Sequence, residues 1–346
     1  MEVPNSVCWN ITKNCNDNCL FCYRDQESED LNFDDRIKVI DLVAKSGIRK
    51  LTFAGGEPLL IPEIKELIHY AKCKGLLVSM TTNGILLTDN LLDFCLEKLD
   101  WLTLSLDGAD EREQLMMTRH EGHVQRVLDI LDYAEAYNQK RCKIKINTVI
   151  SNVNKDQIMD IADLVLKFHI DRWKIFQFIP LRGMAKINKK TFYISNKCFE
   201  DCVYKIQDYM KNSMTLISVS NRKNIESAHF VIFPDGNVRI SQNLRDQIVG
   251  NILVDDIRQL WENEAYQKEL HKERTGFISC LFVICINLQL IDLGQVGNPV
   301  IADMGRYPVS KKRIAVKKEP SLGDTVGLII KLLRHHLIKV LKFLLL

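Results

Sequence analysis

Residues 15–23 read CNDNCLFCY, so Cys15, Cys19 and Cys22 lie in one short loop, separated by three and then two residues. Three thiolates can bind three irons of a cubane four-iron cluster. The fourth iron is then left open, as one position is left open in catalytic zinc sites. The alternative is a structural zinc site, which needs a further cysteine or histidine nearby, and the nearest histidine is His69. We therefore expect the three cysteines to be the protein ligands of a 4Fe–4S cluster.

A second motif lies in residues 50–58, which read KLTFAGGEP. The pattern predicts a short strand that breaks at Gly55 and Gly56, before an acid and a proline. Adjacent glycines let a backbone approach a ligand closely. Here the ligand would be the amino group of S-adenosylmethionine, with Glu57 as a nearby acceptor, because an open iron is what reductive cleavage of this cofactor requires. On its own, the motif would be an ordinary strand-to-helix turn.

Together, the cysteine loop and the glycine motif resemble the radical S-adenosylmethionine superfamily. The resemblance implies a 4Fe–4S cluster and S-adenosylmethionine as cofactors, with Tyr23 among the cofactor contacts. Asn83 and Ser105 stand at the ends of predicted strands, and Arg119 lies in the loop after the second of them. Such side chains can hold the ribose and the methionine carboxylate. Each alone is better explained by a turn or a cap, and their shared position at strand ends makes a cofactor site an equal alternative.

The composition fits one catalytic domain with additions, because 46% of the 346 residues are hydrophobic. Eleven cysteines would suggest disulfides in a secreted protein, but the first residues show no signal-peptide pattern. We therefore expect a reducing, cytoplasmic location. The net charge of +3 divides unevenly. Residues 306–346 hold ten Lys and Arg against two acids (+8), and the remainder holds 37 against 42 (−5). The body is therefore not expected to bind nucleic acid.

Apolar runs alternate with helical patterns along the body, which is typical of a parallel βα array. The predicted strands are Val7–Ile11, Lys50–Phe53, Leu76–Thr81, Trp101–Leu106, Lys143–Ile150 and Trp173–Phe178. The predicted helices are Asp34–Ser46, Ile61–Lys74, Asp89–Lys98, Val124–Tyr137 and Lys155–Phe168. We expect an α/β fold, an incomplete (β/α)6 TIM-like barrel with a small C-terminal α/β addition. The predicted divisions are 1–190 for the barrel, 191–276 for a region that closes the active site, and 277–346 for a tail.

The fifth and sixth predicted strands carry an unusual set of charges. Lys145 and Asn147 alternate with isoleucines in the fifth strand, and Arg172 and Lys174 share one face of the sixth. Strands of a parallel barrel are normally covered on both sides and apolar, and buried Lys or Arg is rare unless paired. One interpretation is a solvated edge of an open barrel. The other is a cationic interior built to receive an anion such as a polyphosphate.

From about Val7 to about Gly276 the chain is similar to viperin and its prokaryotic relatives. These are antiviral radical S-adenosylmethionine lyases that dehydrate nucleoside triphosphates to 3′-deoxy-3′,4′-didehydro products. The resemblance implies triphosphate contacts from Lys145, Asn147, Arg172 and Lys174, with Lys50 as a weaker candidate. It also implies an external one-electron reductant of the flavodoxin or ferredoxin type. No catalytic side chain is assigned beyond the cluster and the cofactor. Animal members have a serine where this chain has Ala54, so one cofactor contact differs.

The C-terminal part has a different character. Residues 277–291 are apolar but too few to span a bilayer, which needs about 20 residues. In residues 325–346, Lys331, Arg334 and Lys339 belong to one basic stripe of a predicted amphipathic helix. Such a helix suits a membrane surface; packing on the body and a spurious extension of the reading frame are the alternatives. For the whole chain, the second hypothesis is a radical peptide- or cofactor-maturation enzyme. The third is a non-catalytic iron–sulfur protein tethered to a membrane.

Overall fold

A computed structural model describes residues 2–225 and 228–275. The strands are β1 Ser6–Thr12, β2 Lys50–Gly55, β3 Leu77–Thr82, β4 Trp101–Ser105, β5 Lys143–Ile150, β6 Arg172–Gln177, β7 Leu216–Ser220, β8 Phe230–Ile232, β9 Asn237–Gln242 and β10 Arg245–Asn251. The α-helices are α1 Phe33–Ser46, α2 Ile64–Cys73, α3 Asp89–Lys98, α4 Glu111–Met116, α5 His123–Ala136, α6 Ile158–Lys167, α7 Gly183–Ile187, α8 Lys189–Phe192, α9 Asn196–Tyr209, α10 Arg222–Ile225, α11 Ile257–Trp261 and α12 Lys268–Thr275. A short 3₁₀ helix, η1, covers Pro58–Leu60.

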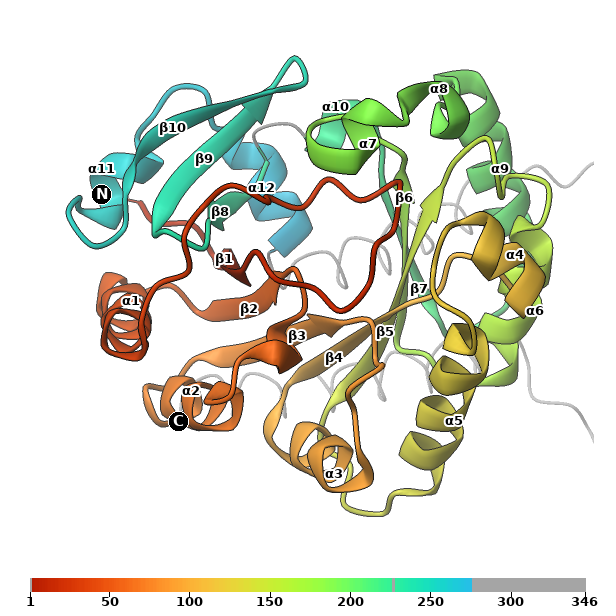
Figure 1. Cartoon of the computed structure of the whole chain (residues 1–346), viewed down its shortest axis with the longest axis horizontal. Coiled ribbons are helices and arrows are strands. Elements are labelled where there is room, and N and C mark those ends of the chain that lie inside the picture. The colour runs from red at the N-terminus through yellow and green to blue at the C-terminus, as the bar shows by residue number, and fades with distance from the viewer. Residues whose placement is uncertain (1, 226–227, 276–346) are drawn as a thin grey trace, which may run out of the picture. The chain divides into compact units, whose positions relative to one another are not determined.

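Within these residues the strands form one sheet in the order β10-β9-β8-β1-β2-β3-β4-β5-β6-β7. The pairs from β8 through β1 to β7 are parallel, and the β8-β9 and β9-β10 pairs are antiparallel. The sheet is open, because no pairing joins its two edge strands β10 and β7 among the described residues. Helices α1, α2, α3 and α5 lie along its outer side, and the segment after β1 crosses its inner side (Figure 1).

The six predicted strands and five predicted helices are all present, which confirms the α/β fold class. The helix boundaries follow local chemistry. In α1, the Asn32 side chain accepts a hydrogen bond from the backbone N–H of Asp35, which caps the helix N-terminus. Gly47 ends it with φ = 92°, a left-handed conformation that favours glycine. Between these ends, α1 buries Val39, Ile40 and Val43 against the outer face of the sheet.

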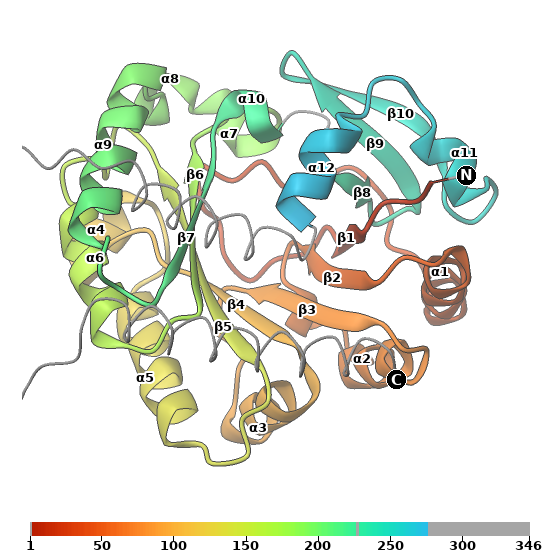
Figure 2. The same ribbon diagram turned by 180° about the vertical axis from the view of Figure 1, so that it is seen from behind.

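Two further parallel strands were missed from the sequence. β7 pairs with β6 on one side of the predicted six strands (Figure 2), and β8 pairs with β1 on the other. β7 and β8 have only five and three residues, so their periodicity is too short to separate them from loops. A turn in residues 233–236 joins β8 to β9, with Gly236 at φ = 79°. Strands from both sides of residue 190 belong to the same sheet. The predicted boundary between residues 1–190 and 191–276 stays a prediction.

The predicted tail, including residues 277–291 and 325–346, lies outside the described residues. Among the described residues, no helix combines the length and the hydrophobicity needed to cross a bilayer. The predicted membrane-surface contact of the tail therefore stays a prediction.

The glycine motif fixes the cysteine loop to the sheet by direct backbone contact. The N–H of Gly56 donates to the Thr12 carbonyl, and the N–H of Glu57 donates to the Asn14 carbonyl, both at 2.8 Å. A Cβ at position 56 would stand 1.9 Å from the Asn14 oxygen, and one at position 55 would stand 2.7 Å from the Thr12 oxygen. Only glycine allows this approach. In this structure the partner that the glycines approach is therefore the start of the cysteine loop.

Replacing Gly56 by Ala should displace this loop, because the Asn14 carbonyl must move. We expect a loss of about 3 kcal/mol in the free energy of unfolding, together with reduced iron uptake. Gly75→Ala is the matched control, since Gly75 has φ = 81° but no atom within 4 Å of its Cβ position. It should cost about 1 kcal/mol, from backbone strain alone. Denaturant unfolding and iron analysis test this; equal losses in both variants would contradict it.

Candidate active site

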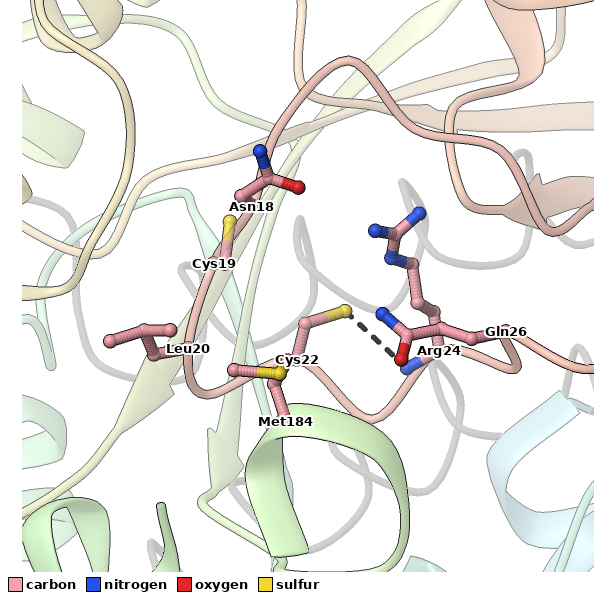
Figure 3. Close-up of a pocket in the computed structure, with 7 residues that line it drawn as sticks. All are labelled: Asn18, Cys19, Leu20, Cys22, Arg24, Gln26 and Met184. Atoms are coloured by element: carbon pink, nitrogen blue, oxygen red, sulfur yellow. Dashed lines mark hydrogen bonds between the residues drawn. The ribbon is translucent and has the colours of Figure 1, made fainter. Parts of the chain in front are cut away.

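The three cysteines lie in the loop that follows β1, at the carboxyl end of the parallel strands. The Cys22 N–H donates to the Cys19 carbonyl at 3.1 Å, which turns the chain between these two residues. Cys19 is 8% exposed, and Cys15 and Cys22 are partly accessible. The Cys19 and Cys22 side chains line a cavity of about 220 Å³ with Arg24, Gln26 and Met184, the last from α7 (Figure 3).

The donor set of this loop, three free thiols within eight residues, suits a cluster with three protein ligands, and the assignment of the ligands stays a prediction. In the part of the chain that the structure describes, no group of three His, Cys, Asp or Glu side chains is arranged to hold a single metal ion. A cubane asks for a wider arrangement, since each thiolate binds a different iron. Burial raises the pKa of the Cys15 and Cys19 thiols. Because the thiolate is the ligand, cluster binding must release their protons.

Glu57 is buried and ties the glycine motif to the end of β3. Its Oε1 accepts from the Thr82 hydroxyl at 2.7 Å and from the Leu59 N–H at 3.1 Å. Its Oε2 accepts from the Asn83 N–H at 2.8 Å. Burial raises the pKa of Glu57, and these hydrogen bonds oppose the rise. The carboxylate is thus already bound by three protein donors; its predicted contact with a cofactor amino group stays a prediction.

The other predicted cofactor residues gather around the same loop. The Asn83 amide donates to the Asn16 Oδ1 at 2.8 Å. Ser105 ends β4 and pairs in register with Asn147 of β5. Arg119 lies over the Phe21 ring, 5.2 Å from its centroid. The structure therefore brings Asn83 and Arg119 to the loop itself and places Ser105 at the end of its strand.

Tyr23 directly follows the last cysteine of the loop and lies near the hairpin formed by β9 and β10. The Arg182 guanidinium lies 5.5 Å from the centre of the Tyr23 ring and 4.9 Å from that of Phe233, and it pairs with Asp246 of β10. Tyr23 exposes 36% of its surface, yet burial raises the pKa of its phenol.

Arg239 of β9 fixes the segment after the loop from the other side. It pairs with Asp25 at 3.3 Å and donates to the Ser28 hydroxyl at 2.8 Å. Its guanidinium also lies 4.1 Å from the centre of the Phe233 ring. The hairpin therefore holds residues 23–28, although more than 200 positions separate Arg239 from Ser28 along the chain.

The predicted charges of β5 and β6 share the inner face of the sheet. Along both strands, alternate residues such as Ile144, Ile146, Trp173 and Ile175 are buried on the other face, and Lys145 directly opposes Arg172. Asn147 likewise opposes Lys174. These charges do not lie at an edge of the sheet, because β5 and β6 are flanked by β4 and β7.

Lys50 and Cys8 belong to this inner face as well. Burial, and then repulsion by Arg172, lowers the pKa of Lys50 to about 8. Burial raises the pKa of the Cys8 thiol, and the positive charges of Lys174, Lys145 and Lys50 oppose that rise. Side chains from β1, β2, β5 and β6 thus lie within electrostatic reach of one another. We call the set Lys50, Lys145, Asn147, Arg172 and Lys174 the cationic face.

Two residues of this region could not be found from the sequence. The Trp101 ring lies under three cations, at 5.5 Å from the Nζ of Lys50, 5.5 Å from the Nζ of Lys143 and 5.1 Å from the guanidinium carbon of Arg172. Ser218 of β7 opposes Lys174 in register, and its hydroxyl is buried with no hydrogen-bond partner among the described residues. Ser218 was missed because β7 itself was missed.

An open, mostly parallel sheet with a three-cysteine loop at its carboxyl end defines the class of protein. The family model of the Radical SAM superfamily matches residues 9–165. The chain therefore contains a radical S-adenosylmethionine domain, whose cofactors are a 4Fe–4S cluster and S-adenosylmethionine.

Several curated relatives carry one name. An S-adenosylmethionine-dependent nucleotide dehydratase of Flammeovirga pacifica is 28% identical over 287 residues, which cover 78% of this chain and 94% of the relative. A protein of the same name from Lacinutrix mariniflava is 30% identical, over 68% of this chain but only 50% of that protein. A GTP 3′,8-cyclase of Chlorobaculum tepidum is 35% identical over 44% of this chain and 48% of its own length.

Solved structures share the fold at low identity. Streptococcus suis SuiB bound to its precursor peptide has a TM-score of 0.60 at 16% identity, covering 80% of this chain and 67% of SuiB. The anSMEcpe protein with bound AdoMet has a TM-score of 0.58 at 17% identity, covering 75% of this chain and 81% of that protein. At these identities the likeness concerns the fold alone.

Replacing Cys19 by Ala should abolish the cluster, because three thiolates are required and the loop holds no spare cysteine. Anaerobically reconstituted wild type should bind about four irons, and the variant should form neither cluster nor 5′-deoxyadenosine. Cys95→Ala, at a buried cysteine of α3, is the control for losing one cysteine and should keep its iron. Uptake of one zinc and no iron by the wild type would contradict the assignment.

Proposed function

We propose that this protein dehydrates a ribonucleoside triphosphate to its 3′-deoxy-3′,4′-didehydro analogue. The observation that carries the proposal is the cationic face, which lies on the same sheet as the cysteine loop. Four cations and an amide on one face of interior parallel strands are unusual, since such strands are normally apolar. A triphosphate supplies the opposite charge and several acceptors. The dehydratase name of two relatives, and the GTP in the name of a third, are consistent with such a substrate.

The positions along the strands give the substrate an orientation. Lys50 and Arg172 are the first residues of β2 and β6, whereas the cysteine loop follows the last residue of β1. A strand rises about 3.3 Å per residue, so the six residues of β6 separate these levels by roughly 15–20 Å. We infer that the phosphates lie toward the strand starts, and that the ribose lies near the cluster.

Asn147 stands between the two ends, at the fifth residue of β5. Its Oδ1 is buried and has no hydrogen-bond partner among the described residues. A buried acceptor of this kind needs a donor, which a ribose hydroxyl would supply, while the amide NH₂ can donate to phosphate. Asn147 therefore suits the boundary between ribose and phosphates.

When bound, the cluster and S-adenosylmethionine supply a 5′-deoxyadenosyl radical that takes a hydrogen atom from the ribose. The protein's part is to hold C4′ of the ribose in place and to neutralise the phosphates. Loss of the 3′-hydroxyl as water, which takes up one proton, and transfer of one electron from an external reductant give the unsaturated product. The substrate as a whole loses one water.

The test is anaerobic incubation with all four ribonucleoside triphosphates, followed by mass spectrometry. We expect a product lighter by one water, formed much faster from a triphosphate than from the matching monophosphate. Formation of 5′-deoxyadenosine without any dehydrated nucleotide would overturn the proposal. A peptide- or cofactor-maturation activity would then be the next hypothesis to examine.

Replacing Arg172 or Lys145 by Ala should weaken nucleotide binding without loss of iron. A charge-assisted hydrogen bond is worth about 1.5–3 kcal/mol, so KM should rise roughly 10- to 150-fold for each. Arg49→Ala removes an exposed arginine just before β2 and serves as the control. Unchanged KM in both Arg172→Ala and Lys145→Ala would contradict the assignment of the phosphate site.

Lys50 predicts a pH dependence of substrate binding. Since burial and Arg172 lower its pKa to about 8, its ammonium is present below that pH and is lost above it. Phosphate groups are already ionised there, because their second pKa is about 6. The nucleotide KM should therefore rise between about pH 7 and pH 9, and Lys50→Met should remove this rise. Lys38→Met, at an exposed lysine of α1, should retain it.

A further inference from the structure

A buried network of charges touches the sulfur of one cluster ligand. The Cys19 thiol donates to the Asp17 Oδ2 at 3.2 Å. The same oxygen lies 3.5 Å from the Nη1 of Arg119 and 4.0 Å from the Nδ1 of His120. The Asp17 side chain is only 4% exposed, so solvent screens its charge little. Asp17 is therefore the carboxylate that contacts a predicted cluster sulfur directly.

Arg119 is itself fixed by a second carboxylate. Its Nε and Nη2 both donate to the Asp107 Oδ2, at 3.0 and 2.8 Å. Asp107 is 1% exposed, and its Oδ1 accepts from the Val149 N–H at 2.7 Å. The guanidinium thus bridges two buried aspartates, one at the end of β4 and one inside the cysteine loop. A contact between Arg119 and the cofactor, as predicted from the sequence, would not explain why Arg119 also pairs with these two aspartates.

The neighbouring residue fastens the same contact. The Thr118 hydroxyl accepts from the Leu20 N–H at 2.6 Å. Thr118 has φ = 60°, a left-handed conformation that costs a threonine free energy. This strained backbone conformation occurs at the point where residues 118 and 119 contact the cysteine loop. Asp17 is consequently held in place from outside the loop and not by the loop alone.

We propose that Asp17, held by Arg119 and Asp107, is a positioning residue that keeps the reduction potential of the cluster low. When the cluster is bound, Cys19 would be a thiolate ligand. The negative charge of the Asp17 carboxylate then lies next to that of the thiolate, with no proton between them. Reduction adds a negative charge to the cluster. A buried carboxylate beside a ligand sulfur opposes that charge, and net charge and contacts to the sulfurs are what set such potentials. A lower potential makes the reduced cluster a stronger reductant for cleavage of S-adenosylmethionine.

The experiment is an EPR-monitored redox titration of anaerobically reconstituted protein, without S-adenosylmethionine or nucleotide. Asp17→Asn keeps the shape of the side chain and removes its charge. We expect the equilibrium constant for reduction to rise about tenfold, which is about 59 mV for a one-electron couple. Asp17→Glu keeps the charge and should stay close to the wild type. Asp110→Asn, at the exposed cap of α4, is the matched control and should not change the potential.

The EPR signal reports intact clusters only, so the potential remains readable when a variant binds less iron. Asp107→Asn provides the second variant: it removes a negative charge from the far side of Arg119 and should raise the potential by a smaller amount. An unchanged potential in both Asp17→Asn and Asp107→Asn would overturn the proposal. So would an equal rise in Asp17→Glu, because the effect would then come from geometry and not from charge. The titration contains no nucleotide, so its result is independent of the proposed dehydration.

Discussion

Two backbone hydrogen bonds between the glycine turn and the cysteine loop are the contact on which the rest of the site depends. They join the N–H groups of Gly56 and Glu57 to the carbonyls of Thr12 and Asn14. Side chains at positions 55 and 56 would push the two segments apart. Because β1 and β2 are adjacent parallel strands, this contact sets the height of the cysteine loop above the sheet. The other side chains that contact the cysteine loop do so at the position that these two hydrogen bonds set.

From this point the loop is held from three directions. Asn83 reaches it from the end of β3, Arg119 from the segment after β4, and the hairpin of β9 and β10 holds residues 23–28. Arg239 belongs to the hairpin, and Arg182, which precedes α7, pairs with Asp246 of β10; both guanidinium groups lie on the Phe233 ring. These contacts hold a long loop without regular secondary structure in one conformation. A rigid scaffold with a functional loop at the strand ends is the usual division of labour in such folds.

The inner and outer faces of the sheet differ in the polarity and burial of their side chains. Outward residues such as Ile146 and Trp173 are apolar and fully buried, and the Trp173 indole N–H is satisfied by the Thr148 hydroxyl at 2.9 Å. On the inner face of β5 and β6, Lys145, Asn147, Arg172 and Lys174 are charged or polar and only partly covered, and the apolar Val149 and Phe176 follow them toward the strand ends. The helices stabilise the sheet from outside, which leaves the inner face available for polar side chains. A cationic interior is tolerated because the outer face supplies the core.

The sequence by itself determined the three-cysteine loop, the glycine turn and the alternation of charge along β5 and β6, because each depends on residues close together in the chain. The period of two along a strand is enough to place Lys145 with Asn147, and Arg172 with Lys174, on a shared face. The tertiary structure alone decided that these strands are interior, since the short β7 and β8 give no readable period. It alone decided that Arg119 meets Asp17, which lies 102 positions away. Contacts of that span depend on how the elements pack, and no local pattern records them.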